Sequence, residues 1–251
     1  MTWNVHGSSR PSARGLARVI AEQQPDVVAL QEVRWHQAAL LSRSLGMRRV
    51  WVLKHFPYSP LVPWAAEGMA ILTPHQLVRP GARTVSRGAT VLTYRRRLAQ
   101  WATIVRGHPA DGEEVLLFNV HLSPGELAEQ RRSEASNVDA AARRLTGALP
   151  LVIAGDLNDA DDPSIIATLP GVEAEAPAFT NPADRPSQTL DHVLVPTGAA
   201  VQRTHVPAGG RAWARLSDHL PVTVTFSLEQ DRDGRRSNTR PEVDGGSPPG
   251  E

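Results

Sequence analysis

The chain contains no cysteine among its 251 residues. This absence excludes a disulfide framework, a thiolate nucleophile and a zinc site with cysteine ligands. Aromatic residues make up only 5% of the sequence, and no segment interleaves them with basic residues, as surfaces that stack nucleic-acid bases do. No hydrophobic run approaches the roughly 18 residues that a membrane-spanning helix needs. We therefore expect a protein with no membrane span.

The chain also lacks a strong charge of either sign. Its 27 basic residues almost balance 26 acidic ones, for a net charge of +1. This balance argues against coating long nucleic acid by bulk electrostatics, although it leaves a local basic rim around a cleft open. The first residues show neither the basic start nor the apolar run of a signal peptide. We expect a cytoplasmic monomer, and a leader upstream of Met1 stays open.

Two common catalytic motifs are missing as well. There is no glycine-rich phosphate cradle of the G-x-x-x-x-G-K-[ST] type and no G-x-S-x-G nucleophile elbow. The sequence therefore gives no support for a P-loop nucleotide hydrolase or for a serine hydrolase.

The hydrophobic content, 41%, suits one domain with a sizeable core, which we place at residues 1–228. Residues 229–251 are polar, charged and rich in glycine and proline, so we predict a disordered tail there. Short apolar segments predict strands at residues 2–5, 27–30, 50–53, 69–72, 89–94, 101–105, 115–120, 152–154, 190–195, 201–205 and 222–226. Helical periodicity predicts helices at residues 12–22, 36–45 and 125–145. The arginine triplet at residues 95–97 is predicted to form a hairpin turn. Many short strands and few helices indicate two packed sheets flanked by helices.

Polar side chains recur where the predicted strands begin or end. The clearest case is the apolar run at residues 151–154, which is followed by Gly155, Asp156 and Asn158. The same pattern supplies five further sets, namely Asn4, Glu32, His121, Asp191, and Asp218 with His219. Each of these residues alone has an ordinary explanation as a turn, cap or core-edge residue. Because unpaired acids and histidines at strand ends are costly, their recurrence indicates that they satisfy one another or a cation.

These residue types suit the metal-assisted hydrolysis of a phosphoester. Carboxylate and amide oxygens without thiolate favour a hard ion, Mg²⁺ or Mn²⁺, over zinc. Two histidines remain for proton transfer and for hydrogen bonds to phosphate oxygens. A histidine with a carboxylate behind it can accept a proton from water near neutral pH.

The motifs that hold these residues come in a recognisable order. They are Thr2-Trp-Asn-Val5, Leu30-Gln-Glu-Val33, Gly68-Met-Ala-Ile-Leu72, Asn119-Val-His-Leu122, Gly155-Asp-Leu-Asn158, Leu190-Asp-His-Val193 and Ser217-Asp-His-Leu-Pro221. The set resembles the endonuclease/exonuclease/phosphatase (DNase I-like) superfamily over residues 2–226. The resemblance implies an α/β fold, a four-layered α/β/β/α sandwich in which two packed mixed β-sheets are flanked by helices. It also implies divalent-metal-dependent cleavage of a P–O bond by in-line attack of water.

The resemblance implies a role for each residue at the metal. Glu32 resembles the principal metal ligand of the family. Asn4 stands beside it, binding directly or through water. Asp218 resembles a further metal or structural ligand. The implied ion is Mg²⁺ or Mn²⁺.

It also implies a set of catalytic residues. Asp156 and Asn158 resemble the pair that positions the attacking water and the phosphate. His219 resembles the general base or phosphate-polarising histidine, with Asp191 orienting its imidazole. His121 resembles the second histidine, which donates to a phosphate oxygen and assists the leaving group. Whether Asp156 or His219 takes the water proton stays open.

Several alternatives remain at this stage. If the protein is an enzyme, we expect a phosphoester substrate, which is either a small molecule or the backbone of DNA or RNA. The alternative from another functional class is a non-catalytic binding protein that has kept the fold. The AP-endonuclease branch usually carries lysine and tyrosine where Val33 and His192 stand here. Glu67 either pairs with His121 or is a surface carboxylate. The arginines at residues 131–132 either contact a phosphate or form a solvated helix face.

Overall fold

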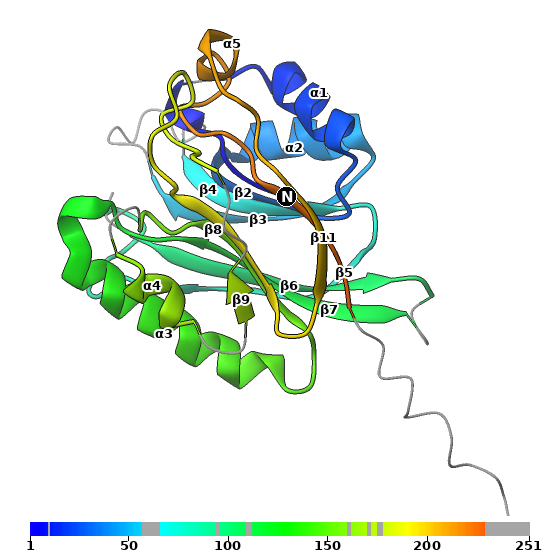
Figure 1. The fold of residues 1–251 in the computed structure, drawn as a ribbon, viewed down its shortest axis with the longest axis vertical. Helices are drawn as coiled ribbons and strands as arrows, with labels where there is room; N and C mark the ends of the chain where they lie inside the picture. Colours follow the sequence, from blue (N-terminus) through cyan, green and yellow to red (C-terminus); the bar gives the residue numbers. More distant parts are fainter. Residues whose placement is uncertain are drawn as a thin grey trace, which may run out of the picture.

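Two β-sheets pack face to face, and helices cover the outer face of each (Figure 1). A computed structural model describes residues 1–9, 11–56, 66–93, 96–108, 112–159, 162–169, 172–174 and 178–228. The arrangement confirms the four-layered α/β/β/α sandwich expected from the sequence. The tail predicted at residues 229–251 lies outside the described residues. Within the described ranges, no helix is long and apolar enough to cross a lipid bilayer.

The first sheet has four strands in the order β1-β2-β4-β3, where β1 and β2 are parallel and the other pairs antiparallel. Its strands are β1 (Thr2–Asn4), β2 (Val28–Arg34), β3 (Arg48–His55) and β4 (Glu67–Thr73). Its outer face is covered by α1 (Ala13–Gln23) and α2 (Trp35–Leu45), and the short helix η1 (Gly7–Ser9) follows β1. Buried Leu16 and Ile20 of α1 belong to one apolar cluster with Leu30 and Leu72 of the sheet. This cluster explains why α1 is amphipathic.

The second sheet has six strands in the order β5-β6-β7-β8-β10-β9. They are β5 (Gln76–Thr84), β6 (Leu98–Arg106), β7 (Glu113–His121), β8 (Leu151–Asp156), β9 (Val172–Ala174) and β10 (Asp191–Pro196). The long helix α3 (Ala128–Thr146) covers this sheet, with η3 (Gly125–Leu127) before it and α4 (Ser164–Ala167) after β8. Val138 and Ala142 of α3 cluster with Phe118 and Val120 of the sheet. A separate two-stranded antiparallel sheet is formed by β11 (Ala200–His205) and β12 (Thr223–Ser227), and α5 (Arg211–Ala214) lies in the segment that connects them.

A network of buried amide side chains joins the two sheets at the centre of an otherwise apolar interface. The Asn119 side-chain amide on β7 donates to the Leu30 carbonyl at 3.0 Å, the Ala70 carbonyl at 3.1 Å and Gln100 Oε1 at 3.1 Å. Its Oδ1 accepts a hydrogen bond from Gln31 Nε2 at 2.7 Å. Because β2 and β4 belong to one sheet and β6 and β7 to the other, these bonds hold the two sheets in a fixed relative position.

One predicted strand is wrong. Residues 91–92 form a turn, and residues 89, 90 and 93 have no regular secondary structure. Residues 94–95 lie outside the described part of the chain. The edge strand that pairs with β6 is β5, whose register shifts between Val78 and Gly81. Arg79 there has φ +49° and Pro80 follows it. Proline and a bulge interrupt the alternation of a strand, so the sequence pattern of β5 is hidden. The predicted hairpin turn at residues 95–97 includes residue 95, which lies outside the described residues. Arg96 and Arg97 lie in the segment that connects the antiparallel strands β5 and β6.

Candidate functional site

The register of the second sheet brings the central site residues together. In the parallel pair β7–β8, His121 lies beside Asp156. In the antiparallel pair β8–β10, Asp156 lies beside Asp191. Directly paired residues on adjacent strands project to the same face of a sheet. Three side chains from different strands therefore form one row, as the strand-end pattern predicts.

Glu32 reaches the same place through an irregularity in the first sheet. The register of β2 against β4 shifts between Leu30 and Val33, which marks a β-bulge at Gln31 and Glu32. Glu32 has φ +52°, a left-handed conformation that is uncommon for residues other than glycine. Bulges redirect single side chains and are frequent beside functional sites. Here the bulge puts the carboxylate of Glu32 in front of His121, with Oε1 3.9 Å from Nε2.

The turn after β8 is built on a close approach between two strands. A Cβ atom on Gly155 would lie 1.9 Å from the Val120 carbonyl oxygen, so only glycine fits there. Asn158 follows with φ +51°. Its backbone N–H donates to Asp156 Oδ1 at 3.1 Å, and its side-chain amide donates to the Leu122 carbonyl at 3.0 Å. These bonds fix the carboxylate of Asp156 at the end of β8.

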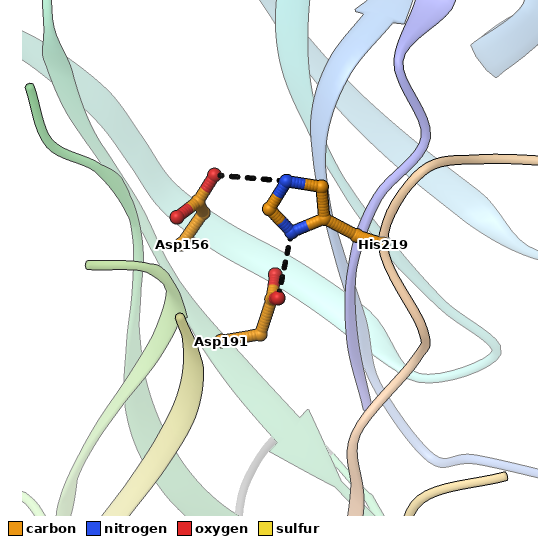
Figure 2. A group of neighbouring side chains, drawn as sticks. All are labelled: Asp156, Asp191 and His219. Atoms are coloured by element: carbon orange, nitrogen blue, oxygen red, sulfur yellow. Dashed lines mark hydrogen bonds and ion pairs between the residues drawn. The ribbon is translucent and has the colours of Figure 1, made fainter. Parts of the chain in front are cut away.

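His219 lies between two buried aspartates (Figure 2). Its Nδ1 is 2.8 Å from Asp191 Oδ2, and its Nε2 is 3.9 Å from Asp156 Oδ2. Burial disfavours the charged imidazolium, but the neighbouring carboxylates of Asp191 and Asp156 outweigh it and raise the pKa of His219 to about 10. Burial and the charge of Asp191 raise the pKa of Asp156 to about 7, against the opposing effect of His219. The three groups are thus electrostatically coupled.

Asn4 and Asp218 occupy the side of the site formed by the first strand. The Asn4 side-chain amide donates to Asp156 Oδ2 at 2.9 Å, and its Oδ1 accepts from the His6 backbone N–H at 3.1 Å. Asp218 lies at the rim with a side chain 48% exposed, and its Oδ1 is 3.0 Å from His6 Nδ1. Burial opposes the ionisation of Asp218, yet the hydrogen bond with His6 holds the pKa of Asp218 below its usual value and raises that of His6. The predicted metal role of Asp218 stays a prediction.

Two cations that sequence reasoning missed form the opposite wall. The Lys54 ammonium, fully buried, donates to Glu32 Oε1 at 3.1 Å and lies 3.5 Å from His121 Nδ1. Arg97 donates to His121 Nε2 at 3.1 Å. Burial and the charges of Lys54 and Arg97 lower the pKa of His121 well below its usual value. Since arginine can only donate, Nε2 accepts here, and donation from this nitrogen to a phosphate oxygen needs a different arrangement of the two side chains.

The missed cations had different signals in the sequence. Lys54 is the only lysine among the chain's 27 lysine and arginine residues, and this rarity is the signal that could have singled it out. Arg97 stood in the arginine triplet that was predicted to form a turn. Burial lowers the pKa of Lys54, and the ion pair with Glu32 opposes that shift. For Glu32, the positive charge of Lys54 outweighs burial and lowers the pKa of the carboxyl group.

Glu67 and His192 have roles other than those that the sequence suggested. Glu67 is buried, and its carboxylate lies 3.8 Å from His55 Nε2, so it is neither a surface group nor ion-paired with His121. Burial and the charge of Glu32 raise the pKa of Glu67. His192 Nε2 lies 2.8 Å from Asp159 Oδ1 in a buried pair. That pair ties the turn after β8 to β10, and Asp159 was not expected to take part.

One cavity of the protein is lined by none of the predicted site residues. Its volume is about 1010 Å³. It is lined by Val27 just before β2, Arg106 at the end of β6 and Glu113 at the start of β7. It therefore lies at the ends of the strands opposite to Glu32 and His121, and the chemistry described above is not located there.

Comparison with known proteins agrees with this geometry. The sequence model described as the Endonuclease/Exonuclease/phosphatase family matches residues 1–219. The chain belongs to this family. Comparison with the sequences of curated proteins gave no match.

Several solved structures share the fold. An endonuclease/exonuclease/phosphatase from Bacteroides vulgatus matches with a TM-score of 0.72 and 19% identity, covering 91% of this chain and 97% of that one. The mannosyl-6-phosphatase Bt3783 from Bacteroides thetaiotaomicron matches with a TM-score of 0.69 and 19% identity, covering 90% and 98%. The human Nocturnin catalytic domain with bound sulfate matches with a TM-score of 0.68 and 20% identity, covering 90% and 92%. At these identities, the likeness to solved structures shows the endonuclease/exonuclease/phosphatase fold and leaves the substrate open.

Proposed function

We propose that this chain is a divalent-metal-dependent phosphoesterase, which cleaves a P–O bond by in-line attack of a water activated by a His/Asp pair, His219 and Asp156. The observation that carries the proposal is the buried group of Asp156, Asp191 and His219, whose ligand atoms all lie within 4.8 Å of one another. Membership of the endonuclease/exonuclease/phosphatase family supports it, because the family is typical of metal-dependent phosphoesterases.

The donor set fits a hard divalent cation. Oxygens of Glu32 and Asp156 lie 3.9 and 3.7 Å from the same nitrogen of His121, so two carboxylates face one space. Oδ1 of Asp191 is buried without a hydrogen-bond partner. Oxygen ligands without thiolate are those that Mg²⁺ and Mn²⁺ prefer. In this proposal Glu32 is the principal ligand, with Asn4 beside it and Asp218 at the rim. When bound, the ion would neutralise negative charge on the phosphoryl oxygens.

The chain's own groups account for water activation. Asp191 accepts the Nδ1 proton of His219, so that Nε2 faces Asp156 across 3.9 Å. That separation is too long for a direct hydrogen bond, and one water between the two groups can bond to both. Asp156, whose pKa is raised to about 7, takes the proton of the attacking water, while His219, whose pKa is raised to about 10, keeps its protons and donates Nε2–H to that water. The departing ester oxygen takes up a proton from solvent water as the P–O bond breaks.

The wall formed by Lys54 and Arg97 supports binding of a phosphoryl group. Both cations lie beside His121, and Arg97 presents a planar fork that matches phosphate oxygens. Asn158 donates its backbone N–H to Asp156 Oδ1 and so holds that carboxylate at the end of β8. Positive groups that face developing negative charge in a water-poor site stabilise the transition state.

The test is turnover of a generic diester and a generic monoester. Purified protein is assayed with bis-p-nitrophenyl phosphate and p-nitrophenyl phosphate in the presence of Mg²⁺ or Mn²⁺, with and without EDTA. We expect turnover that EDTA abolishes, and loss of several orders of magnitude in Glu32→Gln and His219→Asn. Glu22→Gln, an exposed partner of Arg18 on α1, is the matched control.

A parallel arm with DNA and RNA tests the nuclease alternative, for which a steep loss of binding with added salt is the signature. If neither esters nor nucleic acids are cleaved and calorimetry shows no Mg²⁺ or Mn²⁺ binding, the chain is a binding protein that keeps the fold, and the proposal is wrong.

A further inference from the structure

A second cavity opens beside the candidate site. Its volume is about 560 Å³, and Asn158 contributes to both the cavity and the turn that holds Asp156. The cavity is otherwise lined by the start of α3, including Arg131 and Arg132, and by Gln188 before β10. A substrate whose scissile phosphate lies at Asp156 would therefore extend its next group into this cavity.

Arg131 is the unusual residue of the cavity. Its side chain comes from the first turn of α3, and the residue is 2% exposed. Its Nη1 donates to the Ser123 carbonyl at 3.3 Å, while its Nε has no hydrogen-bond partner. Within the described ranges it makes no ion pair with an acid. Arg132, the next residue, differs because it is exposed and its Nη1 lies 2.8 Å from Asp162 Oδ2.

This environment favours an anion beside Arg131. Glu134, a buried acid of the same helix, accepts hydrogen bonds from Ser123 and Gln130 and forms no ion pair with Arg131. A buried guanidinium without an ion-pair partner is costly, so a bound anion would stabilise it. The first turn of a helix carries partial positive charge, and α3 has no side-chain cap there. Two acids also line the cavity, but Asp162 is engaged by Arg132 and Ser164, and Glu126 is exposed, where solvent screens it.

We propose that Arg131 binds a second phosphate group of the substrate, next to the phosphate that is cleaved. The inference rests on the proposed phosphoesterase function and specifies its substrate class as phosphoesters that carry a further phosphate. Arginine suits this task because its fork donates two parallel hydrogen bonds to phosphate oxygens. The second phosphate belongs either to a nucleotide chain or to a sugar bisphosphate, two sources with the same chemistry.

The experiment compares matched substrates that differ only in the second phosphate. One pair is the p-nitrophenyl ester of thymidylate with and without a phosphate on the other sugar hydroxyl, followed by release of p-nitrophenol. The other pair is fructose bisphosphate and fructose monophosphate, followed by release of inorganic phosphate. We expect the wild-type kcat/KM to be about ten- to a hundredfold higher for the bisphosphorylated member of one pair, the value of a charged hydrogen bond. The pair that shows the preference identifies the source.

Variants then assign the preference to Arg131. Arg131→Met should erase the preference while leaving kcat/KM for the singly phosphorylated substrate unchanged, and Arg131→Lys should keep part of it. Arg143→Met, which removes an exposed charge of the same helix that pairs with Asp139, is the matched control and should keep the full preference.

Three results would overturn the inference. Equal kcat/KM for both members of each pair in the wild type would do so without any variant. An equal loss on both members in Arg131→Met would show that Arg131 only holds the segment at Ser123. No turnover of any substrate by the wild type would contradict the proposed function as well as this inference. Turnover without a preference for the bisphosphorylated substrate would contradict this inference alone.

Discussion

Nδ1 of His219 lies 2.8 Å from Oδ2 of Asp191, and this hydrogen bond decides which nitrogen of the ring faces Asp156. Asp191 comes from β10, whereas His219 precedes β12. Two segments distant in sequence thus fix one imidazole, and the bond is buried where water does not compete for it. Its loss should therefore affect catalysis more than binding.

Asp191→Asn should lower kcat by at least about a hundredfold, because an amide neither stabilises the imidazolium nor holds the required tautomer. KM should change little. The measurement is kcat and KM for bis-p-nitrophenyl phosphate with saturating Mg²⁺. Asp139→Asn, an aspartate paired with Arg143 on α3, is the control and should keep the wild-type kcat. A wild-type kcat in Asp191→Asn would show that this hydrogen bond plays no part in water activation.

Lys54→Met should destabilise the metal-free protein by about 3 kcal/mol, because it leaves the carboxylate of Glu32 without its buried ion-pair partner. Added Mg²⁺ should restore much of this loss, since a cation at Glu32 replaces the missing charge. Denaturant unfolding in EDTA and in Mg²⁺ measures both effects. Arg18→Met, which breaks an exposed pair with Glu22, should cost less than about 1 kcal/mol in either buffer. If Mg²⁺ stabilises the variant no more than the wild type, Glu32 is not a metal ligand.

Asn119→Ala should destabilise the fold by about 3 kcal/mol or more. It leaves several buried polar groups without a hydrogen-bond partner, and each such group costs about 1–3 kcal/mol. The groups left without Asn119 are the carbonyl oxygens of Leu30 and Ala70 and the side chains of Gln31 and Gln100. Asn137→Ala removes a single hydrogen bond to the Val85 carbonyl and should cost about 1 kcal/mol. Urea unfolding of both variants makes the comparison. Equal losses would show that the amide network adds nothing beyond one hydrogen bond.

His55 should make the protein less stable in mild acid. Burial and the charge of Lys54 lower the pKa of His55 to about 4, against 6.5 for an unperturbed histidine. As the pH falls from 6.5 towards 4, the unfolded chain takes up a proton that the folded protein does not, so stability is lost in this window. Above pH 6.5 the contribution is fully present.

His55→Gln should therefore flatten the fall of unfolding free energy across that pH window. Urea titrations at a series of pH values measure the slope. His36→Gln, which changes an exposed histidine of α2, should leave it as steep as in the wild type. An unchanged slope in His55→Gln would mean that another group causes the acid sensitivity.

The sequence predicted the layers and the meeting of polar strand ends because both follow from local patterns. An apolar run that stops at Asp156 or begins at Asp191 marks a strand end without knowledge of its partners. Once the strands pair, the ends of neighbouring strands must lie together. Family resemblance added the order of the motifs, and the family match over residues 1–219 confirms it.

What the sequence did not predict depends on contacts between distant segments. The bulge at Glu32 exists only in the pairing of β2 with β4. The burial of Lys54 follows from the pairing of β3 with β4 in the first sheet and from the position of His121. Edge strand β5 was missed because Pro80 and the bulge beside it break the alternation by which strands are recognised.

A row on adjacent strands of the second sheet is formed by His121, Asp156 and Asp191. Sequence changes in the segments that connect these strands therefore have different effects from changes in how the strands pair. The members of the row are carried by hydrogen-bonded backbone, so insertions or exchanges in the connecting segments leave their spacing untouched. If the chain is the phosphoesterase proposed here, its substrate range can change through those segments alone, while the proposed catalytic groups keep their positions. A slip of one residue between β7 and β8 would instead turn the row to the other face of the sheet and abolish every activity at once.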